Sequence, residues 1–357
     1  MQLTVSKSIK RIIVVGFLAI SCLNILFLFQ FNGNKHLPPP VRPTDHYMDV
    51  ALSFAHAVYV KEWDAIPEQF NFTPRDPDGS YELKRPGWDS SKAFNKIARS
   101  GWKLYFNHIG VDANRLRDIQ ILTGSKIGTN NKPAFVIAFR GSTSIFDYLF
   151  TNCKNNPVSL TGLRMLGNFK VEYSRNVIWD QYDVPSLAVM TCNVMTTRLS
   201  NLTAEAPVFV HWGYMEKVVY GLDAKVIDPV NGGLLSVVEA LDKYPDADFV
   251  ITGHSSGGGA AQVLSALVYE MGFCRQNIHI RTFATAGAFN YTGQTQYKSL
   301  DSINYFLPND PILIVNNLTG YGPLGVSVMV PPTRRFSQNS TTVHEMTAYD
   351  EQLRQDD

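Results

Sequence analysis

Residues 248–261 read DFVITGHSSGGGAA, in which an apolar run leads into Gly-x-Ser-x-Gly and then into small residues. This order predicts a buried strand, a sharp turn and a closely packed helix. Gly253 and Gly257 remove the side chains that would collide in so tight a turn. A serine hydroxyl is a weak nucleophile, and such a turn lifts it to where a base can reach it. The stretch therefore predicts that Ser255 is a nucleophile and that the backbone N–H of Ser256 faces a developing oxyanion.

The pentapeptide alone leaves other interpretations open. A Gly-rich turn, or a phosphate-binding loop at a helix N-terminus, can have a similar sequence. Ser256 is a second candidate nucleophile, but it lacks the paired glycines two residues away on each side. The remaining residues of a catalytic triad are therefore the test of the motif.

Where this turn carries a catalytic serine, the acid and the base follow it in that order. Only His279 and His344 come after the serine, and His279 lies inside an apolar run that predicts a strand. His344 is therefore the predicted base. Of the two aspartates between Ser255 and His344, Asp301 begins a predicted strand and Asp310 follows its end. Functional groups of open α/β sheets gather beyond the carboxyl ends of strands, which favours Asp310 as the acid.

Short apolar runs alternate with helical patterns along the chain. Strands are expected near residues 117–122, 134–139, 207–211, 247–252, 279–284 and 302–307, and helices at the start of the body near Val50–Val58 and near residues 90–107 and 230–243. The first of these helices is expected to be amphipathic. The alternation predicts a mainly parallel central sheet flanked by helices. Together with the Gly-x-Ser-x-Gly turn after a strand, it predicts an α/β-hydrolase fold. Ser142, in the polar turn after residues 134–139, is the candidate for a second oxyanion donor.

Together these segments resemble the class 3 lipases, the family of the fungal triacylglycerol lipases. In the family's order, the similar parts are Phe139–Ser142, Val210–Tyr214, Gly253–Ser255, Thr282–Ala284, Asn309–Pro311, and His344 with Tyr349. The resemblance implies a triad of Ser255, Asp310 and His344, with Ser142 and Ser256 as oxyanion donors. It also implies a structural role for His211, a lipid ester substrate at a membrane or lipid surface, and no metal or cofactor.

Three departures from the family pattern concern the surroundings of the triad. Ser256 stands where Leu is usual, Ala286-Gly287 replaces Pro-Arg, and Thr151 replaces an acid that braces the oxyanion serine in many fungal members. None removes a catalytic atom. The family's lid position is occupied by residues 145–150, an apolar cluster with one charge at Asp147. This suits a lid within an insertion at about 143–206, although an ordinary buried helix is the alternative.

The first residues of the chain differ from the rest. Ile12–Phe29 is uncharged and apolar and follows Lys7, Lys10 and Arg11, which predicts a signal anchor over residues 1–31, with a removed signal peptide as the alternative. A Pro-rich stalk at 32–46 then precedes the hydrolase domain at 47–357. We expect a single-pass membrane protein with a lumenal or extracellular catalytic domain, or else a secreted one.

Two sequence features fit that compartment. Glycosylation sequons occur at Asn71, Asn201, Asn290, Asn317 and Asn339, and Asn290 is left out as a candidate because the family has an Asn there near a helix start. The body also contains Cys153, Cys192 and Cys274. A Cys153–Cys192 bridge with Cys274 as a buried thiol is the preferred pairing, although sequence cannot fix connectivity.

The overall charge narrows the class of partner. Lys plus Arg total 32 and Asp plus Glu 31, without a long run of either sign, so we expect no nucleic acid. The main hypothesis is a lipid-ester hydrolase of triacylglycerol lipase type. A phospholipase or diacylglycerol lipase, a peptidase or small-ester esterase on the same sheet, and a non-catalytic membrane-anchored lipid-binding protein are the alternatives.

Overall fold

A seven-stranded sheet in the order β1-β2-β3-β8-β9-β10-β11 forms the centre of the fold. The computed structural model describes residues 45–59, 90–109, 119–128, 130–141, 157–159, 208–273, 277–319, 321–331 and 343–354. The strands are β1 (Lys103–Ile109), β2 (Ile119–Ile127), β3 (Pro133–Phe139), β8 (Asp248–His254), β9 (Ile278–Phe283), β10 (Asp301–Phe306) and β11 (Val326–Met329). From β3 to β11 all pairs are parallel, whereas β1, β2 and β3 pair antiparallel.

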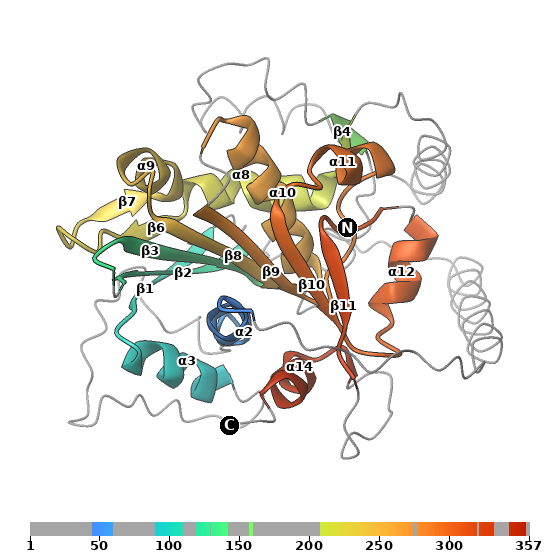
Figure 1. Cartoon of the computed structure of the whole chain (residues 1–357), viewed down its shortest axis with the longest axis horizontal. Coiled ribbons are helices and arrows are strands. Elements are labelled where there is room, and N and C mark those ends of the chain that lie inside the picture. Colours follow the sequence, from blue (N-terminus) through green and yellow to red (C-terminus); the bar gives the residue numbers. More distant parts are fainter. Residues whose placement is uncertain are drawn as a thin grey trace, which may run out of the picture. The chain divides into compact units, whose positions relative to one another are not determined.

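Helices cover both faces of this sheet, as Figure 1 shows. They are α2 (Met48–Ala57), α3 (Ser90–Arg99), α8 (Trp212–Asp223), α9 (Val237–Lys243), α10 (Ser256–Glu270), α11 (Tyr291–Gln296), α12 (Ile312–Thr319) and α14 (Met346–Leu353). Helices α2, α3 and α14 lie on one face, and α8 and α10 lie on the other. The buried residues of β8 form a continuous run, as expected for a strand covered on both sides. The predicted α/β-hydrolase fold, with its mainly parallel sheet, is confirmed.

The first helix, α2, differs from its prediction in burial. The helix lies where the spacing predicts it, but every residue from Ala51 to Ala57 is buried, including Ser53 and His56. The amphipathic prediction was wrong because α3 and α14 cover the side of α2 that faces away from the sheet. The helix is therefore part of the core.

Three other predicted elements need correction. The helix expected at 90–107 ends at Arg99, because Gly101 takes the left-handed φ of +77° that commonly ends a helix, and Lys103 starts β1. The helix expected at 230–243 begins only at Val237, where Ser236 and Glu239 form a capping box. Residues 234–236 instead form β7, paired with β6 (Lys225–Ile227).

The strand predicted at 207–211 exists but lies outside the central sheet. It is β5 (Phe209–His211), which pairs antiparallel with β4 (Pro157–Ser159). The strand is only three residues long, because the chain turns directly into α8 after His211. His211 is buried and stacks on Tyr214, at a ring-centroid distance of 4.1 Å, in keeping with a structural role.

Several predictions fall outside the described residues: the anchor, most of the stalk, the lid insertion apart from β4, and all four cysteines. Asn71, Asn201 and Asn339 also lie outside them, and the side chain of Asn317 is not described. Across the ranges described above, no helix combines the length and apolarity needed to cross a membrane. The domain boundaries at 31 and 46 stay predictions.

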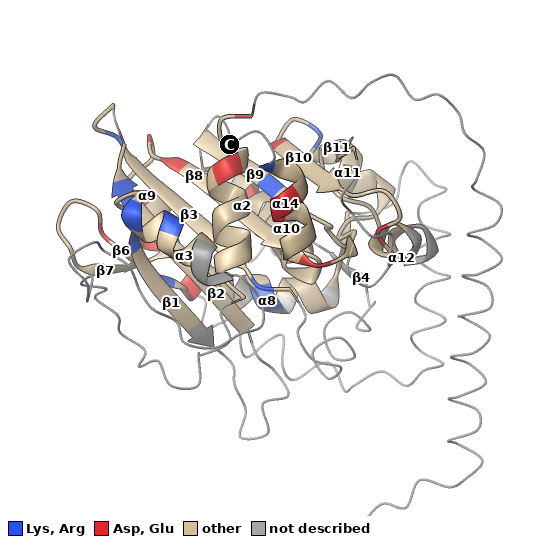
Figure 2. Ribbon diagram, turned by 90° about the horizontal axis from the view of Figure 1, so that it is seen from below, with Lys and Arg blue, Asp and Glu red and all other residues tan. Residues whose placement is uncertain are grey.

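Charged residues of both signs are spread over the described elements, and much of the ribbon carries no charge (Figure 2).

Asn290 is fully buried, and its side-chain oxygen accepts hydrogen bonds from the N–H groups of Phe209 (3.0 Å) and Gly293 (3.1 Å). Its amide therefore serves as a helix cap and is not accessible as a glycosylation acceptor.

Candidate active site

The turn between β8 and α10 holds Ser255 in a strained conformation. Its φ of 55° and ψ of −125° lie in a region that non-glycine residues rarely occupy. The surrounding backbone fixes it: the Ser255 N–H donates to the Phe283 carbonyl (3.0 Å), and the Ser255 carbonyl accepts from the N–H groups of Gly258 (3.0 Å) and Ala286 (3.1 Å). The predicted strand, turn and helix are confirmed, with Ser255 as the N-cap of a helix that begins at Ser256.

The two glycines of the motif are required by close backbone approach. A Cβ atom at Gly257 would collide with the carbonyl oxygen of Phe139, and one at Gly253 would collide with the backbone of Gly257. The helix start therefore lies directly against the end of β3. This contact brings Arg140 and Gly141 next to the turn that carries Ser255.

The three residues predicted as a triad lie in one hydrogen-bonded line. His344 Nε2 is 3.0 Å from Ser255 Oγ, and His344 Nδ1 is 2.8 Å from Asp310 Oδ1. The Asp310 side chain is completely buried, whereas that of His344 is 28% exposed. With its Nδ1–H donated to the carboxylate, the imidazole has an Nε2 lone pair that can accept the serine proton.

Asp310 is held by two further donors. Tyr349 OH donates to its Oδ2 (2.7 Å) and the Ile312 N–H donates to its Oδ1 (2.9 Å). Tyr349 in turn accepts from the Leu307 N–H (3.0 Å). Burial, and then the nearby Asp310 charge, raise the pKa of Tyr349 well above its usual value, so the phenol stays a donor. The family resemblance included Tyr349 without giving it a role, and in the structure it is a hydrogen-bond donor to Asp310.

A second chain of hydrogen bonds reaches the backbone of His344. The Gly141 N–H donates to Tyr59 OH (2.9 Å), Tyr59 OH lies 2.8 Å from His254 Nδ1, and His254 Nε2 lies 2.7 Å from the His344 carbonyl. Since a carbonyl only accepts, the His254 proton is on Nε2, and Tyr59 donates to Nδ1. Burial, and then the neighbouring His344, lower the pKa of His254 well below its usual value, so this imidazole is neutral.

Of the two predicted oxyanion donors, only Ser256 lies within the described residues. Ser256 is fully buried at the first position of α10, where the helix N-terminus provides partial positive charge. Ser142, the other predicted donor, and Thr151 lie outside the described residues, although Gly141 is buried beside the Ser255 turn. The role of Ser142 stays a prediction.

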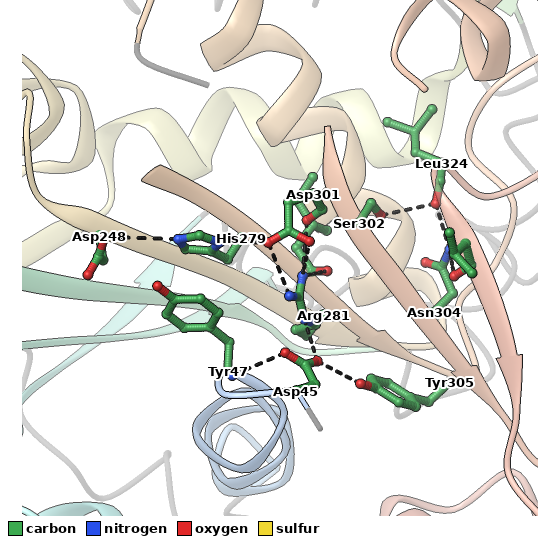
Figure 3. Close-up of polar contacts among 12 residues, drawn as sticks. Asp45, Tyr47, Asp248, His279, Arg281, Asp301, Ser302, Asn304, Tyr305 and Leu324 are labelled. Carbon is green, nitrogen blue, oxygen red and sulfur yellow. Dashed lines mark hydrogen bonds and ion pairs between the residues drawn. The ribbon is translucent and has the colours of Figure 1, made fainter. Parts of the chain in front are cut away.

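Asp301 and His279, which sequence reasoning set aside, lie near the amino ends of their strands. His279 Nδ1 is 2.7 Å from Asp301 Oδ2, and Arg281 joins Asp301 to Asp45 (Figure 3). Tyr305 OH also donates to Asp45 (2.6 Å), just before α2. Burial opposes ionisation of Asp301, but hydrogen bonds from His279 and Arg281 lower its pKa to about 2. This cluster fastens α2 to the sheet and is separate from the triad.

No group of three or more His, Cys, Asp or Glu residues that could hold a metal ion occurs within the part of the chain that the structure describes. The expectation that the protein needs no metal or cofactor stays a prediction. The chemistry available at the triad is acyl transfer, because it requires only a nucleophile, a base and oxyanion donors.

The family model described as Lipase (class 3) matches residues 136–312. Solved structures with similar folds include a triacylglycerol lipase with a serine protease triad at its catalytic centre (14% identity, 87% of this chain and 94% of that chain, TM-score 0.48). Others are the Rhizomucor miehei triacylglyceride lipase (13%, 82% and 82%, 0.45) and the lipase of Rhizopus microsporus var. chinensis (14%, 87% and 89%, 0.46). No curated protein matches the chain. The family match contains Ser255 and Asp310 but ends before His344, whose position beside Ser255 comes from the structure.

Proposed function

From the premise that this chain belongs to the class 3 lipases and is a carboxylic ester hydrolase, we propose that it cleaves acylglycerol esters through an acyl-enzyme on Ser255. The observation that carries the proposal is the line of hydrogen bonds from Ser255 Oγ through His344 to Asp310. A serine, a histidine and a buried carboxylate in this arrangement have the geometry for nucleophilic catalysis.

In the first half-reaction, His344 Nε2 takes the Ser255 proton while Oγ attacks the ester carbonyl carbon. The carbonyl oxygen becomes an oxyanion, stabilised by the Ser256 N–H and the N-terminus of α10. When this intermediate collapses, the ester C–O bond breaks and His344 returns the proton to the leaving alcohol oxygen. The products of this step are the free alcohol and an acyl ester on Ser255.

In the second half-reaction, water replaces the alcohol. His344 takes a proton from water as its oxygen attacks the acyl carbonyl, and a second oxyanion forms at the same donors. Collapse breaks the bond to Ser255 Oγ, which regains the proton from His344, and the fatty acid is released. Throughout, the buried Asp310 carboxylate stabilises the imidazolium that forms twice in each cycle.

The lipid character of the substrate is supported by sequence outside the described residues. The mostly apolar run at 145–150, with Asp147 as its one charge, begins three residues after Ser142, as a lid over an acyl pocket would. We propose that the 143–206 insertion covers the site until it meets a lipid surface. The apolar Ile12–Phe29 segment supports a membrane anchor, with the catalytic domain lumenal or extracellular.

The test is fluorophosphonate labelling of the full-length protein in detergent, with wild type, Ser255→Ala and a matched control compared. Ser265→Ala is the control, because Ser265 is a buried serine of the same helix whose hydroxyl donates to the Ala261 carbonyl (2.8 Å). We expect labelling of wild type and Ser265→Ala, none of Ser255→Ala, and faster hydrolysis of long-chain than short-chain esters. Folded wild-type protein that does not label would refute the mechanism, and a short-chain preference would refute the lipid substrate.

A further inference from the structure

Lys217 of α8 contacts the residue that follows β3 and the first residue of α10. Its Nζ donates to the Arg140 carbonyl oxygen (3.2 Å) and to Ser256 Oγ (3.2 Å). Arg140 lies two residues before Ser142, and Ser256 carries the other predicted donor. Lys217 is only 3% exposed and Ser256 is 0% exposed, so these contacts are shielded from water.

We infer that Lys217 is a positioning residue that joins the end of β3 to the first turn of α10 and places positive charge behind the Ser256 N–H, where an oxyanion would bind. The inference rests on the proposed ester hydrolysis and adds a residue to its machinery. An amino group with several N–H donors can bind the loop after β3 and the start of α10 at the same time. It thereby holds Arg140 and Ser256 at a fixed separation beside the turn that carries Ser255.

Burial of this amino group argues that packing alone does not explain it. Taking a lysine head group out of water is unfavourable unless hydrogen bonds replace its hydration. An apolar side chain of similar length would fill the same space without that penalty. A buried positive group beside a site where negative charge develops acts strongly, because little water screens it.

The helices are built to let Lys217 reach this position. Helix α8 packs closely on α10, since a Cβ atom at Gly259 would lie 2.7 Å from the Tyr214 ring. Ser256 stands where the resembling family usually has Leu, and its hydroxyl is the acceptor for Lys217. The departure from the family pattern therefore supplies a polar partner that leucine could not.

The first experiment compares Lys217→Met with wild type in the full-length protein. Loss of the charge and of the hydrogen bonds to Arg140 and Ser256 should lower kcat about tenfold to a hundredfold while KM changes about twofold or less, because the oxyanion exists only after the attack. Lys103→Met is the matched control: the Lys103 Nζ donates to the Pro229 carbonyl (3.0 Å) at the start of β1. It should keep wild-type kcat and KM. A change confined to KM in Lys217→Met, or an equal kcat loss in the control, would overturn the inference.

A boronic acid inhibitor separates positioning of the oxyanion from general damage. Ser255 Oγ adds to boron, its proton passes to His344, and the adduct carries the negative charge of the tetrahedral intermediate. In Lys217→Met, affinity for a long-chain alkyl boronic acid should fall by the same factor as kcat/KM, with affinity for an uncharged ether analogue of the substrate unchanged. Equal loss of both affinities would indicate only a structural role.

Ser256→Ala gives a second route that does not remove the lysine. It deletes the hydroxyl acceptor and keeps the backbone N–H, so boronate affinity should fall about threefold to tenfold. Combined with Lys217→Met, the effects should be less than additive because both remove one contact. If Lys217→Met does not fold, wild-type boronate affinity in Ser256→Ala overturns the inference. Absence of fluorophosphonate labelling in wild type would instead refute the proposed function itself.

Discussion

Two Asp–His pairs occupy opposite ends of the same sheet and have almost the same geometry. His344 Nδ1 lies 2.8 Å from Asp310, and His279 Nδ1 lies 2.7 Å from Asp301. They differ in the partner of the other ring nitrogen: His344 Nε2 faces Ser255 Oγ, whereas His279 Nε2 lies 3.9 Å from the Asp248 carboxylate. A carboxylate beside an imidazole is therefore no sign of a base by itself. The proposed mechanism also requires a hydroxyl at the other ring nitrogen, which His344 has.

The solvent exposure of the two acids sharpens this difference. The Asp310 side chain is fully buried, and its oxygens accept from Tyr349, Ile312 and the imidazole. The Asp301 side chain is 42% exposed and is shared with Arg281. The Asp310 carboxylate, near Ser255, thus pairs with the imidazole of His344. The Asp301 carboxylate, far from Ser255, is instead part of an ion-pair cluster with His279 and Arg281.

The largest predicted difference is in kcat/KM, when each of the two histidines is replaced by alanine. His344→Ala should lower kcat/KM about 10⁵-fold because it removes the base, whereas His279→Ala should leave kcat/KM within about twofold. His279→Ala should instead lower the free energy of unfolding by about 1–2 kcal/mol, through loss of the Asp301 contact and the stacking on Tyr47. Ester hydrolysis and urea unfolding of both variants measure this. Loss of activity in folded His279→Ala would break the assignment of roles.

Two tyrosines that donate to buried aspartates, Tyr349 to Asp310 and Tyr305 to Asp45, offer a smaller contrast. Tyr349→Phe removes a donor to Asp310, so kcat should fall about tenfold at little change in KM. Tyr305→Phe removes the corresponding donor to Asp45 and should lower stability by about 1 kcal/mol, with kcat unchanged. Steady-state kinetics and thermal unfolding of this matched pair decide the point. Equal kcat for wild type and Tyr349→Phe would remove Tyr349 from the catalytic arrangement.

The smallest expected effect is a pH dependence of stability at the distant pair. Asp301 ionises with a pKa of about 2 when folded and about 3.8 otherwise, so its contribution is complete above pH 3.8 and is lost as the pH falls through 2. The pKa difference corresponds to about 2.4 kcal/mol, which solvent screening of this partly exposed group reduces to about 1 kcal/mol.

Denaturant unfolding between pH 5 and pH 2 should show this loss in wild type and not in Asp301→Asn. Asp49→Asn is the control, because Asp49 is a more exposed acid on α2 whose carboxylate lies 3.9 Å from Lys96 Nζ. In Asp49→Asn the free energy of unfolding should fall with pH as it does in wild type. The same fall in Asp301→Asn would show that the cluster does not stabilise the fold through Asp301.

Sequence alone predicted those parts of the site that depend on chain order and local conformation. The apolar run before Ser255 and the glycines around it describe the turn completely, and the order of serine, acid and base selects Asp310 and His344. The two mistaken helix boundaries also have local causes, in the φ of Gly101 and the capping box at Ser236. These signals were present in the sequence and were outweighed by apparent helical periodicity.

The surrounding contacts could not be predicted, because they join residues far apart in the chain. Tyr59 meets His254 across 195 positions, and Lys217 meets Ser256 across 39. Nothing near Tyr59 in sequence indicates a partner, and a lysine on an otherwise mixed helix normally points to solvent. Only packing of α2 and α8 on opposite faces of the sheet brings these side chains to the same turn.

The separation of 89 residues between Ser255 and His344 also has a consequence for biosynthesis. A ribosome adding about 5–20 residues per second needs roughly 4 to 18 s to pass from one to the other. During that interval Ser255 lacks the His344 imidazole that would take its proton, and its hydroxyl is chemically inert. The nascent chain therefore acquires esterase chemistry only after α14 begins to emerge, when the rest of the sheet has already been synthesised.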